Sequence, residues 1–251
     1  GIGNNPIIFV DPDGREIDDY FDRYGNFLGK DQASTDNIRI LTNHGNTMPQ
    51  GFRNADGSVN REVAIGKGGA QLITEVSFSN AGGLGHDALS KVATHYYEEV
   101  GFDASVLSEE KITVKETTEN SRNTNMSISL SGNTKNFNIY IDGYGKINGE
   151  FYANKFNLMN DIVHEKSHLD NHYKSENGRF IRLGTGFRDQ DGSYRHSEAY
   201  IEQINHPTWK RTSEPFKEEI IRMTGLHIGN IPSDSKRQQR IREYNAALRK
   251  N

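Results

Sequence analysis

The stretch from residue 161 to residue 172 reads DIVHEKSHLDNH and contains the pattern HExxH. Histidines four residues apart lie about one helical turn apart on one face, roughly 6 Å along the axis, so His164 and His168 can point at one ion. That is the chelate geometry that zinc needs. Glu165 is placed to take a proton from a water at the ion and later to deliver it to a leaving amine. The pattern therefore predicts a zinc site with Glu165 as its general base.

The residues around this motif predict a helix from Asn157 to Tyr173, with Asn157 as its N-cap. Ile162 and Leu169 recur at helical spacing and contribute to an apolar side. Ile162 and Val163 directly precede the motif and place it in the interior, where unliganded histidines and a glutamate would be costly to bury. We therefore interpret HExxH as a metal site and not as part of a polar surface helix.

The composition limits the classes of protein to which the chain can belong. Its 251 residues are 33% apolar, with a mean hydropathy of −0.80, a net charge of −4 and a pI near 6.2. No global positive field attracts nucleic acid or anionic lipid, and no apolar run reaches the roughly 18–20 residues of a membrane helix. The absence of cysteine leaves His, Asp and Glu as the strong metal ligands.

The rest of the chain is predicted to contain short strands, polar loops and several helices. We expect a hairpin over 20–28 that turns at 23–26, and strands over 37–42, 71–78, 111–115, 125–130 and 137–141. The last two strands are expected to form a hairpin through residues 131–136. We expect helices over 87–100, 197–205, 215–224 and 233–249, and loops over 43–69, 79–85 and 177–192. The last helix carries a basic face, which we interpret as solvated.

The chain begins GIGNNPIIFVDPDGR, an apolar run closed by a turn that contains proline and glycine. The string NPIIFVDPDG closely resembles the segment that ends the repeat-associated core of Rhs-type polymorphic toxins, large bacterial proteins whose variable C-terminal domains follow that junction. The resemblance covers only residues 1–15. It implies that residues 1–44 form the end of the junction and a β-hairpin preface, and that residues 45–251 form a toxin domain.

Three residues are candidates for the third metal ligand. Glu198, in HSEAYIEQ, follows His168 by 30 residues on an expected helix and resembles the gluzincin arrangement of HExxH plus a later helical glutamate, so it is our first choice. Asp189, in GTGFRD, distantly resembles the aspzincin loop GTxxD, displaced by one position. His196 is the third option. The metzincin pattern is excluded, because position 174 is Lys174 and not histidine.

The resemblance to zincin metallopeptidases also carries an expected fold. It implies an α+β, zincin-like fold in which a small antiparallel sheet is followed by the HExxH helix and further C-terminal helices. In zincins an edge strand before the motif helix holds the extended substrate, and residues 137–141 would do so here. Zincins also use a Tyr, His or Arg donor for the oxyanion. Tyr194, Tyr200 and His206 are the candidates for that donor.

We therefore expect a zinc-dependent endopeptidase toxin domain that hydrolyses peptide bonds in a target-cell protein. The resemblance to polymorphic toxins implies secretion or delivery into a target cell as part of a larger bacterial protein, and a cognate immunity protein. A metal-dependent nuclease toxin domain and a non-catalytic binding domain are the alternatives. The acidity of the chain argues against nucleic acid as a partner, and no membrane partner is expected.

Overall fold

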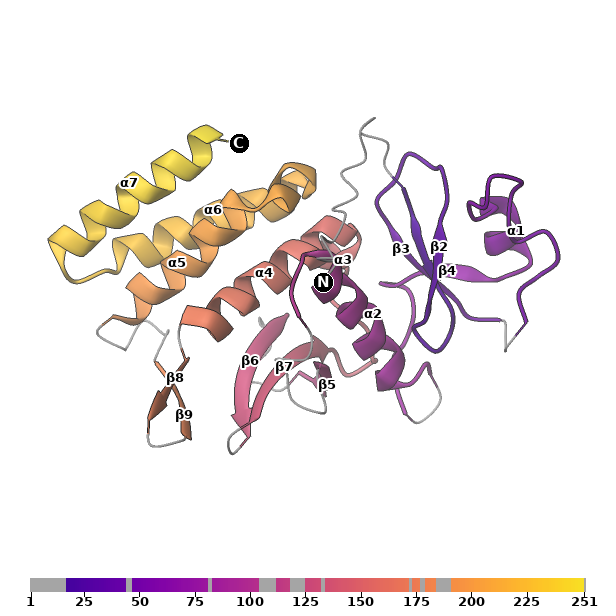
Figure 1. The fold of residues 1–251 in the computed structure, drawn as a ribbon, viewed down its shortest axis with the longest axis horizontal. Helices are drawn as coiled ribbons and strands as arrows, with labels where there is room; N and C mark the ends of the chain where they lie inside the picture. Colours follow the sequence, from indigo (N-terminus) through magenta and orange to yellow (C-terminus); the bar gives the residue numbers. More distant parts are fainter. Residues whose placement is uncertain are drawn as a thin grey trace, which may run out of the picture.

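A computed structural model describes residues 17–43, 47–80, 83–103, 112–117, 125–131, 134–171, 173–176, 179–183 and 191–250. These residues form a mixed α+β fold (Figure 1). The predicted junction segment, residues 1–15, lies outside them. Within the described ranges, no helix is both long enough and apolar enough to span a bilayer.

The strands of the described residues form three small sheets. The first has the order β2-β1-β3-β4 and consists of β1 (Asp19–Phe21), β2 (Phe27–Lys30), β3 (Ile38–Leu41) and β4 (Ala70–Leu72). The second has the order β5-β7-β6 and consists of β5 (Ile112–Glu116), β6 (Met126–Ser131) and β7 (Thr134–Ile141). The third is the hairpin of β8 (Tyr173–Glu176) and β9 (Arg179–Arg182).

The motif helix of the described residues is α4 (Lys155–Asn171). The others are α1 (Arg61–Gly66), α2 (His86–Glu99), α3 (Gly149–Tyr152), α5 (Gly192–Asn205), the 3₁₀ helix η3 (Pro207–Arg211), α6 (Glu214–Gly229) and α7 (Asp234–Lys250). The motif helix α4 packs against α2, α3, α5 and η3, whereas α6 and α7 pack against α5. Figure 1 shows α4 in the middle of the molecule, with the first sheet on one side and α5, α6 and α7 on the other.

The expected hairpin over 20–28 is confirmed, because β1 and β2 pair antiparallel across a turn. In that turn Gly25 has a φ of +79°, and an added Cβ would lie 2.2 Å from the carbonyl oxygen of Ala88, so the position requires glycine. The expected antiparallel sheet before α4 is confirmed only for β6 and β7, because β5 runs parallel to β7. The strand predicted for the edge, residues 137–141, belongs to β7 and lies in the middle of its sheet, whereas β6 lies at an edge.

Helix boundaries also differ from the predictions. The helix α4 starts two residues before the predicted cap, and the side chain of Asn154 accepts a hydrogen bond from the backbone N–H of Phe156. Asn157 instead bonds Ser213: its amide donates to the Ser213 hydroxyl at 2.9 Å and accepts from the Ser213 N–H at 2.9 Å. The helix α5 begins at Gly192 and not at 197, so it includes His196.

The described residues form three apolar cores, and two of them fix the helices around the motif. The larger core joins the first sheet, α2, the second sheet and one side of α4, through residues that include Phe21, Ile40, Phe137 and Ile162. A second core joins α5, η3, α6 and α7, and includes Trp209. The predicted division at residues 44/45 stays a prediction, but Phe21 and Ile40 pack in the same core as Ile162 of the motif helix.

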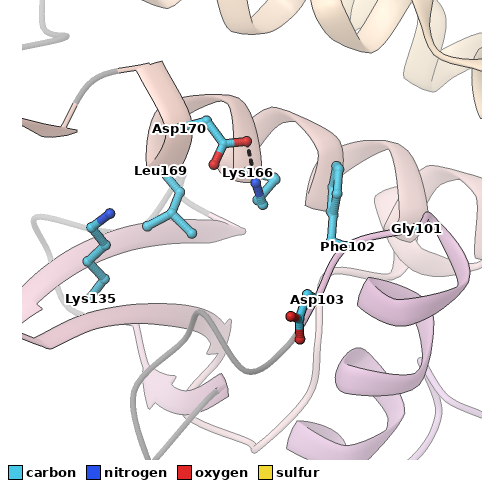
Figure 2. Close-up of a pocket in the computed structure, with 7 residues that line it drawn as sticks. All are labelled: Gly101, Phe102, Asp103, Lys135, Lys166, Leu169 and Asp170. Carbon is cyan, nitrogen blue, oxygen red and sulfur yellow. Dashed lines mark hydrogen bonds and ion pairs between the residues drawn. The ribbon is translucent and has the colours of Figure 1, made fainter. Parts of the chain in front are cut away.

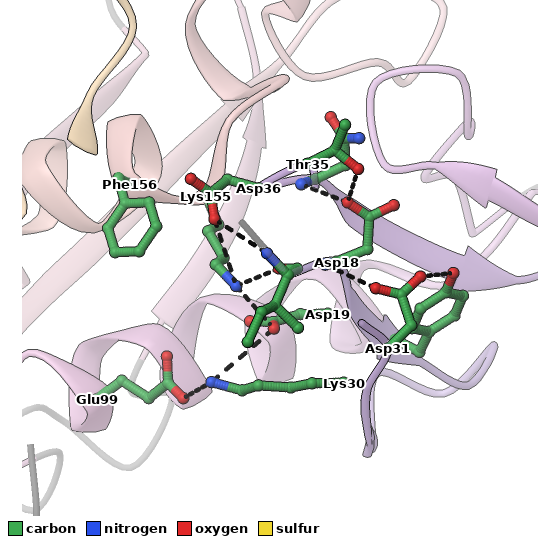
Figure 3. Close-up of polar contacts among 12 residues, drawn as sticks. Asp18, Asp19, Lys30, Asp31, Thr35, Asp36, Glu99, Lys155 and Phe156 are labelled. Atoms are coloured by element: carbon green, nitrogen blue, oxygen red, sulfur yellow. Dashed lines mark hydrogen bonds and ion pairs between the residues drawn. The ribbon is translucent and has the colours of Figure 1, made fainter. Parts of the chain in front are cut away.

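A buried network of aspartates and cations ties the first sheet to the start of α4 (Figure 3). The residue Lys155 is only 4% exposed. Its ammonium group donates to Asp19 Oδ1 at 2.9 Å and to the carbonyl oxygen of Ile17. Its backbone N–H donates to the Asp36 carbonyl at 2.8 Å. The guanidinium of Arg211 at the end of η3 donates to Asp36 Oδ1 at 3.0 Å. The segment over residues 17–36 thus holds both α4 and the segment that follows α5.

Candidate metal centre

A stripe of polar residues, buried except for its last member, runs along α4 where it faces α5 and η3. Its members follow one another at intervals of three or four residues: Asn157, Asn160, His164, His168 and Asn171. That spacing places them on one face of a helix. Because the opposite side of α4 packs in the larger core, the helix is buried on both sides. The polar stripe therefore has to be satisfied by groups on neighbouring helices.

Three imidazoles converge at this stripe. His164 Nε2 lies 3.0 Å from His168 Nε2 and 3.1 Å from His196 Nε2, and all three ligand atoms lie within 4.8 Å of one another. A zinc ion with nitrogen ligands at about 2.0–2.1 Å in tetrahedral geometry separates those nitrogens by about 3.3–3.4 Å. The separations of His164 from His168 and from His196 are therefore close to those around a zinc ion, and the three side chains suit such an ion. His164 and His168 come from α4, and His196 comes from α5.

Gln203 determines which nitrogen of His164 faces the other histidines. It is fully buried, and its amide nitrogen donates to the Asn160 carbonyl oxygen at 3.2 Å. Its Oε1 therefore points at His164 Nδ1, 2.9 Å away, and accepts a hydrogen bond from it. With the proton on Nδ1, the lone pair of His164 Nε2 is directed to the centre of the cluster, as a metal ligand requires.

The carboxyl groups of Glu165 and Asp161 and the hydroxyl group of Tyr200 lie near the histidines. Glu165 is 8% exposed. The ring of Tyr200 lies 4.5 Å from that of His164, between centroids. Burial, and then the charges of Asp161 and Glu165, raise the pKa of Tyr200, so its hydroxyl keeps its proton. That hydroxyl makes no hydrogen bond to any residue that the structure describes. It is a donor available to a bound molecule.

Asp161 lies one turn before the motif on the ligand face of α4. Its Oδ2 accepts a hydrogen bond of 2.7 Å from the hydroxyl of Tyr152, which is fully buried. Burial raises the pKa of Asp161 to about 6, and the hydrogen bond from Tyr152 opposes that rise. A second carboxyl group therefore lies beside the general base predicted from the motif.

A fourth histidine joins this group. His227, on α6, is 3% exposed and stacks on His196, with ring centroids 4.2 Å apart and planes inclined by 26°. Burial lowers the pKa of His227 to about 4, so the ring is uncharged at neutral pH. An uncharged ring next to His196 does not repel a cation.

The remaining predicted site residues lie elsewhere or are not described. Glu198 is two residues from His196 on α5, about 200° around the helix axis, and its carboxylate pairs with Arg240 of α7 at 3.3 Å. Tyr194 is on that same side, with the Arg240 guanidinium 3.9 Å above its ring. The structure thus brings His196 and not Glu198 to the motif histidines. Asp189 lies outside the described residues.

His206, the third predicted oxyanion donor, follows the last residue of α5 and caps η3. Its Nδ1 lies 2.9 Å from the Thr208 hydroxyl and accepts a hydrogen bond from the Thr208 backbone N–H at 3.3 Å. Burial lowers the pKa of His206. These contacts give His206 a structural role at the start of a helix.

A second group of possible ligands is less suited to a metal ion. Asp19, His95 and Glu99 bring ligand atoms within 4.8 Å of one another. The ammonium groups of Lys155 and Lys30 already lie 2.9 Å from Asp19 and 3.0 Å from Glu99, respectively. Because the carboxylates are already paired with two cations, this group is part of the ion network of Figure 3.

A pocket of about 300 Å³ lies beside α4 but away from the histidines (Figure 2). It is lined by Phe102, Lys135, Lys166, Asp170 and three neighbouring residues. Lys166 is two residues after His164, and therefore about 200° around the axis of α4. The pocket is on the other side of the helix from the proposed metal centre and contributes no group to it.

The sequence interpretation missed Gln203 and His227. Gln203 follows His196 by seven residues, or about two helical turns, so both can face α4 once α5 begins at Gly192. The polar stripe of α4 was visible in the sequence and would have indicated that α4 needs a polar partner helix. No comparable pattern marks His227.

Comparison with known proteins gives one result. The family model described as "Metallopeptidase toxin 2" matches residues 19–250. No curated protein and no solved structure matches the chain. The matched region contains both β1, with its link to α4, and all the histidines of the cluster.

Proposed function

Because the chain belongs to the metallopeptidase toxin 2 family, we propose that it is a zinc-dependent endopeptidase of the zincin type, in which His164, His168 and His196 hold the ion. The convergence of three imidazole Nε2 atoms carries this proposal. A set of three protein nitrogens leaves one position of a tetrahedral site open, as catalytic zinc sites do.

When bound, zinc supplies Lewis acidity to the attacking water and to the scissile carbonyl. Glu165 takes a proton from the water and passes it to the leaving amine. Tyr200 donates its hydroxyl to the carbonyl oxygen as negative charge develops there. Gln203 holds the proton on His164 Nδ1 and so keeps His164 Nε2 available as a ligand. The domain thus needs only groups from α4 and α5 for the chemistry.

The proposed ligand set replaces the gluzincin arrangement that the sequence suggested. Residues two apart on one helix cannot both aim at the same ion, and the structure pairs Glu198 with Arg240. This pairing leaves His196 as the ligand from α5. Tyr200, one turn after His196, is for the same reason a better oxyanion donor than Tyr194.

We also propose that the substrate is a protein of a target cell, that a larger bacterial protein delivers the domain, and that a cognate immunity protein neutralises it. The family is one of metallopeptidase toxins, which favours peptide bonds over nucleic acid as the substrate. The preface over residues 17–44 belongs to the same folded unit as α4 in this proposal, since Asp19 and Asp36 hold Lys155.

The test measures zinc content and proteolysis side by side. The native chain, His164→Ala and Glu165→Gln are purified without chelating resin, and zinc per chain is measured by mass spectrometry. We expect about one zinc in the native chain and in Glu165→Gln, and none in His164→Ala. Cleavage of an unfolded protein substrate, detected as new peptide termini, should be lost in both variants. A native chain that takes up no zinc at micromolar concentration refutes the proposal.

The third ligand is tested with a matched pair on α5. His196→Ala is expected to lose most of its zinc affinity, whereas Glu198→Gln, two residues away, is expected to keep it. The opposite result would restore Glu198 as the third ligand and refute the three-histidine set.

A further inference from the structure

His196 reaches the proposed site from a different helix than the other two ligands. His164 and His168 are held one turn apart by α4, whereas the aim of His196 depends on the position of α5 and on two side-chain torsions of its own. Ordering a mobile ligand costs free energy when the ion binds, and contacts that order it beforehand strengthen binding. The contacts of the His196 ring therefore bear on zinc affinity.

Besides the rings of His164 and His168, two rings contact His196 and also contact each other. His227 stacks on it at 4.2 Å, and Tyr200 lies nearly parallel to it at 5.0 Å with a 17° inclination. The centroids of His227 and Tyr200 are 5.7 Å apart. These three distances close a triangle, so each ring limits the rotation of the other two. Tyr200 shares α5 with His196, and hence His227 is the ring in this triangle that links His196 to another helix.

His227 is held in place by its burial and by the packing of α6. Its side chain is 3% exposed, and it lies in the last turn of α6. Phe216 and Ile220 of α6 pack with Ile204 and Trp209 in the second core, which fixes α6 against α5 and η3. Because the ring of His227 is fixed in this way, it restricts the orientation of the His196 ring on which it stacks.

We propose that His227 is a positioning residue that orients His196 toward the zinc ion through ring stacking. It acts on His196 and is not itself a ligand: the group of described residues whose ligand atoms converge contains His164, His168 and His196. This inference rests on the proposed function. It predicts that a flat apolar ring at position 227 can orient His196 as the imidazole does, whereas the methyl group of an alanine cannot.

The experiment measures the zinc dissociation constant of the full chain by competition with a chromogenic chelator. His227→Ala is expected to bind zinc about ten-fold more weakly than the native chain, the lower end of the effect of groups that orient ligands. His227→Phe, which keeps a ring, is expected to stay close to the native value. Leu226→Ala, a neighbouring exposed position on α6, controls for the effect of a substitution on the helix.

The visible spectrum of the cobalt-loaded chain gives a second readout. Native protein and His227→Phe should show the same tetrahedral bands, and His227→Ala should show weaker, shifted ones. Equal zinc affinity in His227→Ala and the native chain overturns the inference and leaves the proposed function intact. A His227→Phe variant as weak as His227→Ala also overturns it, because the imidazole itself is then required. A native chain without zinc overturns both proposals.

Discussion

The Lys155→Met substitution tests the buried ion network that holds the start of α4. Removing one partner of a buried ion pair costs about 3–5 kcal/mol, because the remaining charge is left without compensation. Here Asp19 keeps Lys30 at 3.9 Å and the Tyr96 hydroxyl at 2.9 Å, and Asp36 keeps Arg211. We therefore expect a loss at the low end, about 3 kcal/mol in the free energy of unfolding.

Thermal and urea denaturation of the metal-free chain measure that loss. For a chain of this size, about 3 kcal/mol corresponds to a fall in Tm of about 6–12 °C. Lys217→Met is the matched control, since Lys217 pairs with Glu214, whose side chain is 79% exposed. We expect less than about 1 kcal/mol there. A similarly small loss in Lys155→Met would refute the reasoning that the network stabilises the fold.

A double substitution separates the pair from its surroundings. In Asp19→Asn/Lys155→Met neither charge is left alone, and the asparagine oxygen can still accept from Tyr96. We expect the double variant to lose less free energy of unfolding than the sum of the two single variants. Additive losses would contradict a direct interaction between Asp19 and Lys155.

Three further predictions concern the metal centre. Burial raises the pKa of Asp161 to about 6, above its unfolded value of about 3.9, so the native chain loses stability as the pH rises between these values. Denaturation of the metal-free Asp161→Asn variant should therefore show it up to about 3 kcal/mol more stable than the native chain at pH 7.5 and equal to it below pH 4. An equal difference at both pH values would contradict this. Gln203→Leu should weaken zinc binding about 10–100-fold in chelator competition, because His164 Nδ1 loses its acceptor; unchanged affinity would show that the acceptor is dispensable. Tyr200→Phe should lower kcat about 10²–10³-fold in steady-state assays and retain its zinc, and an unchanged kcat would exclude Tyr200 as the oxyanion donor.

The motif helix could be predicted from the sequence because its evidence is local. The spacing of His164 and His168 requires only one turn of helix, and the apolar residues around them have the same period. The proposed third ligand could not be predicted in the same way. His196 and Glu198 are two residues apart, and which of them faces α4 depends on the rotation of α5 about its axis. That rotation is set by the packing of α5 against η3, α6 and α7 in the second core and by Arg240 of α7, and these partners lie elsewhere in the sequence.

The residues at which helices start are a second point on which the sequence prediction differs from the structure. The sequence pattern predicts a helix that begins at residue 197, so His196 falls just outside it and its alignment with Gln203 is not visible. The parallel pairing of β5 with β7 also had no local signal, since it joins strands separated by β6. The hairpins, whose pairing is set by a turn, were predicted correctly for β1 with β2 and for β6 with β7.

The link between Lys155 and Asp19 also has a consequence for the order of folding. It joins residues that are 136 positions apart in the chain. Contacts of such separation form late, because the chain entropy lost in closing the loop is not recovered until both ends are in place. The start of α4 can therefore be locked only after most of the chain has collapsed. A chain that is synthesised from its N-terminus can therefore attach the motif helix to β1 only after residues 19–155 have all been made and brought together, and not while it is still extended.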